Sequence, residues 1–204
     1  MSRSMEKSPE IQTERLLLRR WRESDLGPFA ALNADPEVRA YLQGPITSAQ
    51  SDAAAEMIAG DLERRGWGLW AVEVTATSEF IGFVGLAEAT FSAPFTPSVE
   101  VGWRLARHAW GYGYATEGAR AALTFGFQEA QLPEILSFTA TLNLRSRSVM
   151  ERIGMQLDPA GDFDHPSVPE GDPIRPHVLY RLTTTARAAL DVSTQKRTSV
   201  HPPG

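Results

Sequence analysis

The clearest hydrophobic pattern in the chain is a strict alternation between residues 99 and 105. Its apolar positions share one side: Val99, Val101, Trp103 and Leu105. The opposite side carries Glu100, Gly102 and Arg104. Because successive side chains of a strand point to opposite faces, this period of two predicts a half-buried β-strand with a polar face.

Shorter apolar segments, bounded by turn residues, predict further strands around this one. They cover residues 13–21, 67–74, 79–89 and 134–142, and the last strands fall in MQLDPAGDFDHP and RPHVLYRLT. The polar turn TATS joins the second segment to the third, which favours an antiparallel hairpin.

The best-marked helix follows Thr47. Thr47 and Gln50 form a capping-box pattern, and Gly66 stands where a C-terminal glycine belongs. Three more helices are expected: one that Ser24 caps, one over residues 115–130, and one that Asn143 or Ser146 caps and that ends at Gly154. This order of elements predicts an α+β fold with a mixed, largely antiparallel sheet.

The chain is predicted to form one domain with two extensions. Neither an internal repeat nor a linker interrupts residues 11–183. Residues 1–10 and residues 184–204 have little to pack against, so we expect an N-terminal extension and a C-terminal tail that are both mobile.

Composition excludes several classes of function. The chain has 42% hydrophobic and 22% charged residues, as is ordinary for a soluble globular protein. Its net charge of -5 argues against a nucleic-acid partner, which normally leaves a basic footprint. It contains no cysteine, so disulfides, thiolate zinc sites and a cysteine nucleophile are excluded. Neither a membrane span nor a signal peptide is evident, and we expect a cytoplasmic protein without a membrane partner.

The stretch AWGYGYATEGA, residues 109–119, lies between the alternating strand and the predicted helix at 115–130. Free amides at a helix N-terminus, together with the helix dipole, bind phosphate. A dinucleotide fold would want GxGxxG early in a chain of parallel strands, and a P-loop would need a lysine that is absent here. Coenzyme A is the third phosphate-bearing ligand to consider. The alternative is a tight turn that packs a helix onto the sheet.

Four separate pieces of the chain, in order, resemble the GNAT superfamily of N-acetyltransferases, and in particular its ribosomal-protein alanine N-acetyltransferase (RimJ/RimL-like) branch. They are TERLLLRRWRESD, FIGFVGL, VEVGWRLARHAWGYGYATEGARAAL and NLRSRSVMERIGM. The resemblance runs from Thr13 to Leu182. It implies the GNAT fold, with six to seven strands, about four flanking helices and a sheet that splays at its central strands. It also implies acetyl-CoA as co-substrate, and no metal.

The resemblance also assigns a set of coenzyme-binding residues. The backbone amides of the pyrophosphate loop would hold the coenzyme A pyrophosphate: Gly111, Tyr112, Gly113, Tyr114, Ala115 and Thr116. The strand edge at Trp103, Arg104 and Leu105 would pair with the pantetheine arm, which Asn143 would steady. Trp110 departs from the polar residue that opens the family's loop pattern. Asn143 also suits a helix N-cap, and the two roles are compatible.

Two residues are candidates for the proton transfers. Glu100, on the polar face of the central strand, is the candidate base, and the alternative is a solvent-facing strand residue. Ser146 is the candidate acid, because Met150 stands where many GNAT enzymes have a tyrosine. Helix capping by Ser146, or protonation of the leaving thiolate by the incoming amine, is the alternative.

The acceptor is expected to be a primary amine, either a protein N-terminus or a small molecule. Trp70, Phe83 and His165 are candidate acceptor-binding residues, although core packing competes for the two aromatic positions. A metal bound by Asp164, His165 and His177 is disfavoured, because spacing alone shows no ligand geometry. A homodimer is compatible with the family. A catalytically idle acyl-CoA sensor or interaction module is the alternative function.

Overall fold

The protein is built on one mixed sheet, which the computed structural model describes for residues 9–188. Nine strands take part in this region: β1 (Ile11–Gln12), β2 (Leu16–Arg19), β3 (Leu69–Val74), β4 (Glu79–Ala89), β5 (Ser98–Leu105), β6 (Glu134–Ala140), β7 (Gln156–Leu157), β8 (Phe163–Asp164) and β9 (Pro176–Thr183). Their order is β1-β2-β3-β4-β5-β6-β9-β7, and β8 pairs with β9. Every pair within the described residues is antiparallel except β5 with β6. The predicted largely antiparallel sheet is confirmed.

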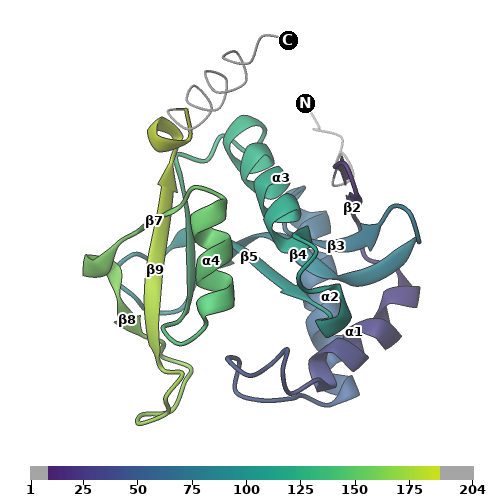
Figure 1. The fold of residues 1–204 in the computed structure, drawn as a ribbon, viewed down its shortest axis with the longest axis horizontal. Helices are drawn as coiled ribbons and strands as arrows, with labels where there is room; N and C mark the ends of the chain where they lie inside the picture. Colours follow the sequence, from purple (N-terminus) through teal and green to yellow (C-terminus); the bar gives the residue numbers. More distant parts are fainter. Residues whose placement is uncertain (1–8, 189–204) are drawn as a thin grey trace, which may run out of the picture.

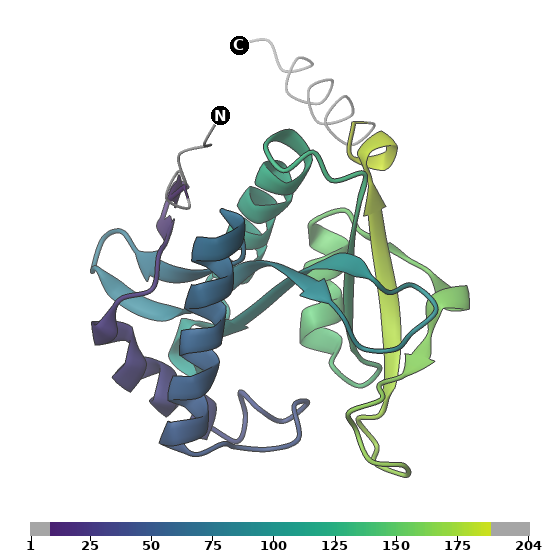
Figure 2. The same ribbon diagram turned by 180° about the vertical axis from the view of Figure 1, so that it is seen from behind.

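Helices cover both faces of the sheet. Figure 1 shows α3 (Tyr114–Gln128) and α4 (Leu144–Arg152) on the near face. Figure 2, from behind, shows α1 (Leu26–Ala34) and α2 (Ser48–Arg65) on the other. Short 3-10 turns are η1 (Glu23–Asp25), η2 (Arg107–Ala109) and η3 (Pro159–Gly161). The two faces of β5 therefore meet different helices.

The helix ends test the predicted caps. Thr47 and Gln50 form the capping box of α2, and Gly66 ends that helix in the left-handed region at φ 77°. Asn143 caps α4, accepting a hydrogen bond from the Ser146 amide at 3.2 Å. These predictions are confirmed. The prediction for Ser24 is wrong, because Ser24 lies inside η1 and the carboxylate of Asp25 instead accepts from the backbone amide that opens the turn.

The core lies on both sides of the central strands. The larger cluster joins β2–β6 and β9 to α3, and a smaller one joins α1 and α2 to β3 and β4. Small residues let α3 approach the sheet closely. A Cβ at Gly118 would lie 3.2 Å from the Val84 side chain, and one at Gly126 would lie 2.6 Å from Ile135. Small residues therefore set the position of the α3 axis.

The sheet opens between β5 and β6. These parallel strands share a single register pair, Glu100 with Leu136. Next to it, the Ser137 hydroxyl donates to the Val101 carbonyl at 2.9 Å, so a side chain bridges the strands just before they part. Beyond this point the cleft-facing edge of β5 has no partner strand among the described residues. The predicted splay is confirmed.

The ends of the domain are described in part. Residues 184–188 are helical, Thr184 donates to the Pro133 carbonyl at 3.1 Å, and Ala186 packs on the larger core. The rest of the predicted tail and residues 1–8 of the predicted extension lie outside the described residues. None of the helices within residues 9–188 is long and apolar enough to cross a membrane.

Candidate functional site

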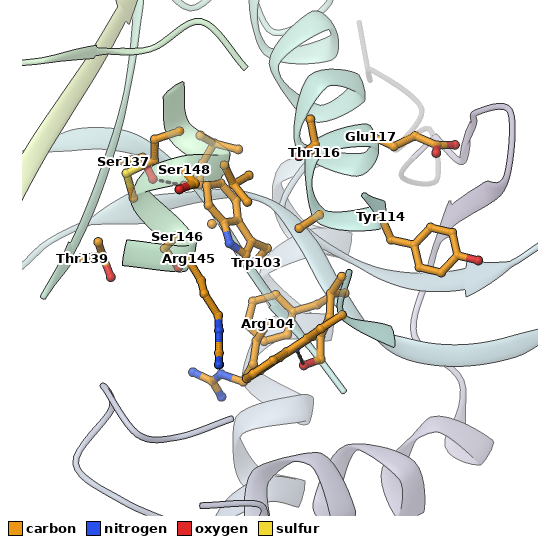
Figure 3. A pocket seen from close by; sticks show the side chains of 18 of the residues that line it. Trp103, Arg104, Tyr114, Thr116, Glu117, Ser137, Thr139, Arg145, Ser146 and Ser148 are labelled. Atoms are coloured by element: carbon orange, nitrogen blue, oxygen red, sulfur yellow. Dashed lines mark hydrogen bonds between the residues drawn. The ribbon is translucent and has the colours of Figure 1, made fainter. Parts of the chain in front are cut away.

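A cleft of about 1540 Å³ occupies the opening between β5 and β6. Its walls come from β5, β6, the residue 107–113 segment, the first turns of α3 and α4, the loop at residues 35–47, and His165 and His177. Figure 3 shows labelled side chains from β5, β6, α3 and α4 around this space. The cleft has two ends: one at the N-termini of α3 and α4, the other at the residue 35–47 loop.

The glycine-rich turn forms the α3 end of the cleft. Gly111 and Gly113 have φ of 86° and 83°, in the left-handed region that favours glycine. A Cβ at Gly111 would meet nothing within 4 Å, and one at Gly113 would have the Arg15 guanidinium as its nearest atom, at 3.6 Å. Gly113 caps α3, so the amides of the first turn have no intrahelical acceptor. All six predicted pyrophosphate-loop residues line the cleft: Gly111, Tyr112, Gly113, Tyr114, Ala115 and Thr116.

An ion pair behind this turn was not predicted. Glu117, in the first turn of α3, accepts from the Thr13 hydroxyl at 2.7 Å and pairs with Arg15 at 2.6 Å. Arg15 also donates to the Tyr112 carbonyl at 2.9 Å, and its guanidinium lies over the Tyr114 ring. The hydrogen bonds lower the pKa of Glu117 despite its partial burial. The pair connects the segment just before β2 to the turn and braces the turn from behind.

The tryptophan that departs from the family pattern supports β5. The Trp110 indole donates to the Leu105 carbonyl at 2.8 Å, at the end of the strand. The guanidiniums of Arg107 and Arg145 lie 4.9 and 4.7 Å from its ring. The three predicted strand-edge residues line the cleft: Trp103, Arg104 and Leu105. Trp110 therefore has a structural role that the sequence did not indicate.

Glu100 lines the cleft at the point where β5 and β6 part. Its carboxyl has no hydrogen bond or ion pair to any residue in the described part of the chain. Burial without a counter-charge raises the pKa of Glu100 to about 8. Glu100 is a half-buried carboxyl that lines the cleft next to the unpaired strand edge, and its role as the base stays a prediction.

The first turn of α4 supplies the predicted asparagine and serine. Asn143 donates to the Thr139 hydroxyl at 2.9 Å and to the Ser146 hydroxyl at 3.0 Å. Both side chains line the cleft. Because the Ser146 oxygen accepts from Asn143, its own hydrogen is free to point elsewhere. Met150 also borders the cleft but is only 1% exposed.

The three candidate acceptor residues differ in their placement. Trp70 does not line the cleft: it is fully buried, it packs on Phe125, and its indole donates to the Pro9 carbonyl at 2.9 Å. Core packing explains this position, so the expectation of an acceptor role for Trp70 is corrected. Phe83 does line the cleft, under the Arg104 guanidinium.

His165 also lines the cleft, 5.0 Å from the His177 ring. Burial lowers the pKa of both histidines, and each is therefore mainly neutral near pH 7. Asp164 pairs with Arg175 at 3.1 Å rather than with either imidazole. Within residues 9–188 there is no group of three side chains placed to hold a metal ion.

Comparison with known proteins gives the family. A model of the acetyltransferase (GNAT) domain matches residues 15–156, most of the chain. The chain belongs to the GNAT acetyltransferase family. A curated relative, the uncharacterized protein YkkB of Bacillus subtilis, is 32% identical over 152 residues, which cover 74% of this chain and 87% of YkkB.

Solved GNAT structures have the same fold. The acetyltransferase of Agrobacterium tumefaciens superposes with a TM-score of 0.69 at 29% identity, over 86% of this chain and 95% of that one. RimL, a ribosomal L7/L12 alpha-N-protein acetyltransferase solved with coenzyme A, superposes with a TM-score of 0.69 over 87% of this chain and 99% of RimL. The two sequences are 17% identical, so the similarity is one of fold. The predicted GNAT fold is confirmed, and the chain shares that fold with RimL, a member of the branch that its sequence resembles.

The GNAT cleft of this chain fits coenzyme A. The open space at Gly111 and Gly113 leaves room for phosphate against the α3 amides, and the unpaired edge of β5 offers backbone groups to an extended amide chain. Glu100, Asn143 and Ser146 line the same space. The structure therefore brings the predicted catalytic and coenzyme-binding residues together in one cleft.

Proposed function

We propose that this GNAT protein is an N-acetyltransferase that moves an acetyl group from acetyl-CoA to a primary amine by direct attack in a ternary complex. The observation that supports it most is Glu100, a half-buried carboxyl without an ion pair that lines the same cleft as the glycine-rich turn. Acetyl-CoA supplies the activated acetyl thioester. A cytoplasmic location and a homodimer stay predictions.

Glu100 is proposed as the base. An alkyl ammonium has a pKa of about 10, and a carboxylate at an ordinary pKa near 4 is a poor match for it. With its pKa raised to about 8, Glu100 holds a transferred proton far better. The carboxylate takes the proton from the ammonium, the amine nitrogen bonds to the acetyl carbon, and the bond from that carbon to sulfur breaks.

The thiolate that leaves needs a proton, and Ser146 is proposed to supply it. Its oxygen already accepts a hydrogen bond from Asn143, which makes the hydroxyl a better donor. The adjacent Met150 carries no acidic proton. The serine recovers its proton from solvent or from the acetylated amine as the products form.

A coenzyme A release screen tests the proposal. The full chain is incubated with acetyl-CoA and, in parallel, with peptides bearing free N-termini and with small primary amines, and free thiol is measured. Calorimetry with coenzyme A reports binding separately. Thiol release that requires an amine supports the transferase. Coenzyme A binding without release across the whole panel would instead support the alternative, an acyl-CoA sensor, which Met150 at the usual tyrosine position favours.

A further inference from the structure

Arg104 is a cation in the cleft that lacks an anionic partner. Its Nη1 donates to the Asn33 Oδ1 at 2.8 Å, and its Nε is buried without any hydrogen bond. Within residues 9–188 no carboxylate pairs with this guanidinium. The Arg104 side chain as a whole is half-buried, and a partly desolvated charge without a partner is unfavourable unless something neutralises it.

A second arginine adds to the excess of positive charge. Arg39, in the loop after α1, is 9% exposed and donates to the carbonyls of Leu42 and Gly44, not to a carboxylate. Burial, and then the charge of Arg39, lower the pKa of Arg104 to about 10. Both cations stay protonated at neutral pH, so the end of the cleft at the residue 35–47 loop carries two positive charges close together.

The acidic groups around this end do not neutralise them. Glu37 is paired with Arg107 at 2.9 Å. Glu100 is four residues from Arg104 along β5, so their Cα atoms are about 13 Å apart at the usual rise of a strand. Its raised pKa leaves Glu100 largely protonated at pH 7. His165 and His177, across the cleft, add no negative charge.

Within the described residues, the most deeply buried arginine is neutralised by carboxylates of the same chain. Arg19 is 2% exposed, and it binds Asp25 through both Nη atoms and Glu73 through Nε, at 2.7 to 2.8 Å. Those hydrogen bonds raise the pKa of Arg19, whereas the pKa of Arg104 is lowered. Arg19 lies in the core, and Arg104 lines a cleft that a ligand enters.

We propose that the Arg104 guanidinium binds a carboxylate carried by the acceptor, so that the amine substrate is an amino acid or an acidic peptide. The inference rests on the acetyltransferase function proposed above. Arg104 is on the face of β5 that meets α1, through Asn33, and α3 with its phosphate-binding turn packs on the opposite face. The anion that Arg104 binds is therefore not a phosphate of the coenzyme.

The positions of the two groups indicate which acceptors to compare. The amine must reach Glu100 while the carboxylate meets Arg104, and these two residues lie on the same face of β5 with Cα atoms about 13 Å apart. Both side chains extend from the backbone, so this value is the separation of the backbone positions and not of the charged groups. An ω-amino acid and a peptide with an acidic second residue both carry a carboxylate several bonds from the amine, and they are the acceptors compared below.

Matched acceptors that differ in one charge test the inference. The first pair is 6-aminohexanoate and 6-aminohexanamide, and the second is an alanine-glutamate and an alanine-glutamine peptide, both with amidated C-termini. The wild type is expected to show kcat/KM at least tenfold higher for the acid of one pair. The pair that shows it distinguishes a free amino acid from a peptide. Equal values in both pairs would overturn the inference.

Two variants locate the carboxylate at Arg104. Arg104→Met should raise KM for the acid and bring the ratio within each pair close to one. Asn33→Asp keeps the side-chain size but gives Arg104 an internal carboxylate, and the same loss of preference is expected even if Arg104→Met does not fold. Arg64→Met, which removes an exposed arginine of α2 paired with Asp61, is the matched control and should keep the wild-type ratio.

Calorimetry separates this inference from the proposed function. 6-Aminohexanoate and the glutamate peptide are titrated into protein saturated with coenzyme A, where no turnover is needed. Binding that is lost in Asn33→Asp supports the Arg104 site even if no thiol is released in any assay. Thiol release from neutral amines, with binding of the acids unchanged in both variants, would overturn the inference and leave the acetyltransferase standing.

Discussion

Replacing Glu100 with glutamine should make the protein more stable and a worse catalyst. The carboxyl is held without a partner in the cleft, and its pKa rises from 4.5 to about 8 on folding. At about 1.4 kcal/mol for each pH unit, that rise corresponds to as much as about 5 kcal/mol of folding free energy lost when the group is ionised. The isosteric amide of Glu100→Gln carries no charge and avoids this loss.

The sign of the effect fixes its pH dependence. Between pH 4.5 and about 8 the folded protein keeps a proton on Glu100 that the unfolded chain has released. Stability therefore falls as pH rises through this window, and the loss is complete above it. Urea denaturation should show the variant and the wild type within about 1 kcal/mol of each other at pH 5, with the variant more stable by up to about 5 kcal/mol at pH 9.

Kinetics and a control complete the test. The wild-type kcat/KM should rise with pH and level off above about 8, whereas Glu100→Gln should lose that limb and turn over about 100-fold to 10,000-fold more slowly. Glu56→Gln, an exposed carboxyl on α2, should change neither property. A stability difference between Glu100→Gln and wild type that is the same at pH 5 and pH 9 would refute the reasoning, as would wild-type turnover by the variant.

Three further variants test the structure around the cleft. Gly113→Val places a branched side chain at φ 83° and should weaken coenzyme A binding, measured by calorimetry, at least tenfold. Its control is Gly60→Ala on α2, where an added Cβ meets open space; this variant should bind coenzyme A normally and be about 1 kcal/mol more stable. Glu117→Gln removes the ion pair with Arg15 and should lower the free energy of unfolding, measured by urea denaturation, by about 2 kcal/mol, with coenzyme A binding weakened in parallel. An unchanged urea midpoint would contradict the bracing role of the pair. Arg19→Met leaves two carboxylates buried and should lose about 3–5 kcal/mol by the same measurement, and a loss below 1 kcal/mol would contradict it.

Local patterns in the sequence were sufficient to predict much of the framework. The capping box at Thr47 and the alternation along β5 depend on neighbours within a few residues, and both have the predicted form. The resemblance also brought Glu100, Asn143 and the glycine turn to one cleft, because the order of its four pieces carries the topology. Structural features that depend on near neighbours or on the order of elements can therefore be predicted from the sequence.

Contacts between distant segments could not be predicted in the same way. Arg15 and Glu117 are 102 residues apart, and nothing local marks either residue as the partner of the other. Trp70 was expected at the acceptor site because of its aromatic side chain, but residue type does not tell which face of a sheet a cleft opens on. It is the packing of α3 against β3 and β4 that encloses Trp70 next to Phe125.

The opening of the sheet explains why binding and proton transfer share one place. Where β5 leaves β6, backbone groups on the strand edge lose their partners, and the N-termini of α3 and α4 border the same gap at Gly113 and Asn143. Two helix N-termini favour anionic groups at that end of the cleft. The opening also leaves Glu100 in a desolvated space without a counter-charge, which raises its pKa. If β5 and β6 stayed paired, the edge of β5 would not be available to an extended ligand. The hydrogen bond from the Ser137 hydroxyl to the Val101 carbonyl holds the two strands together up to the point where they part, so the opening is limited to the part of β5 that faces the cleft.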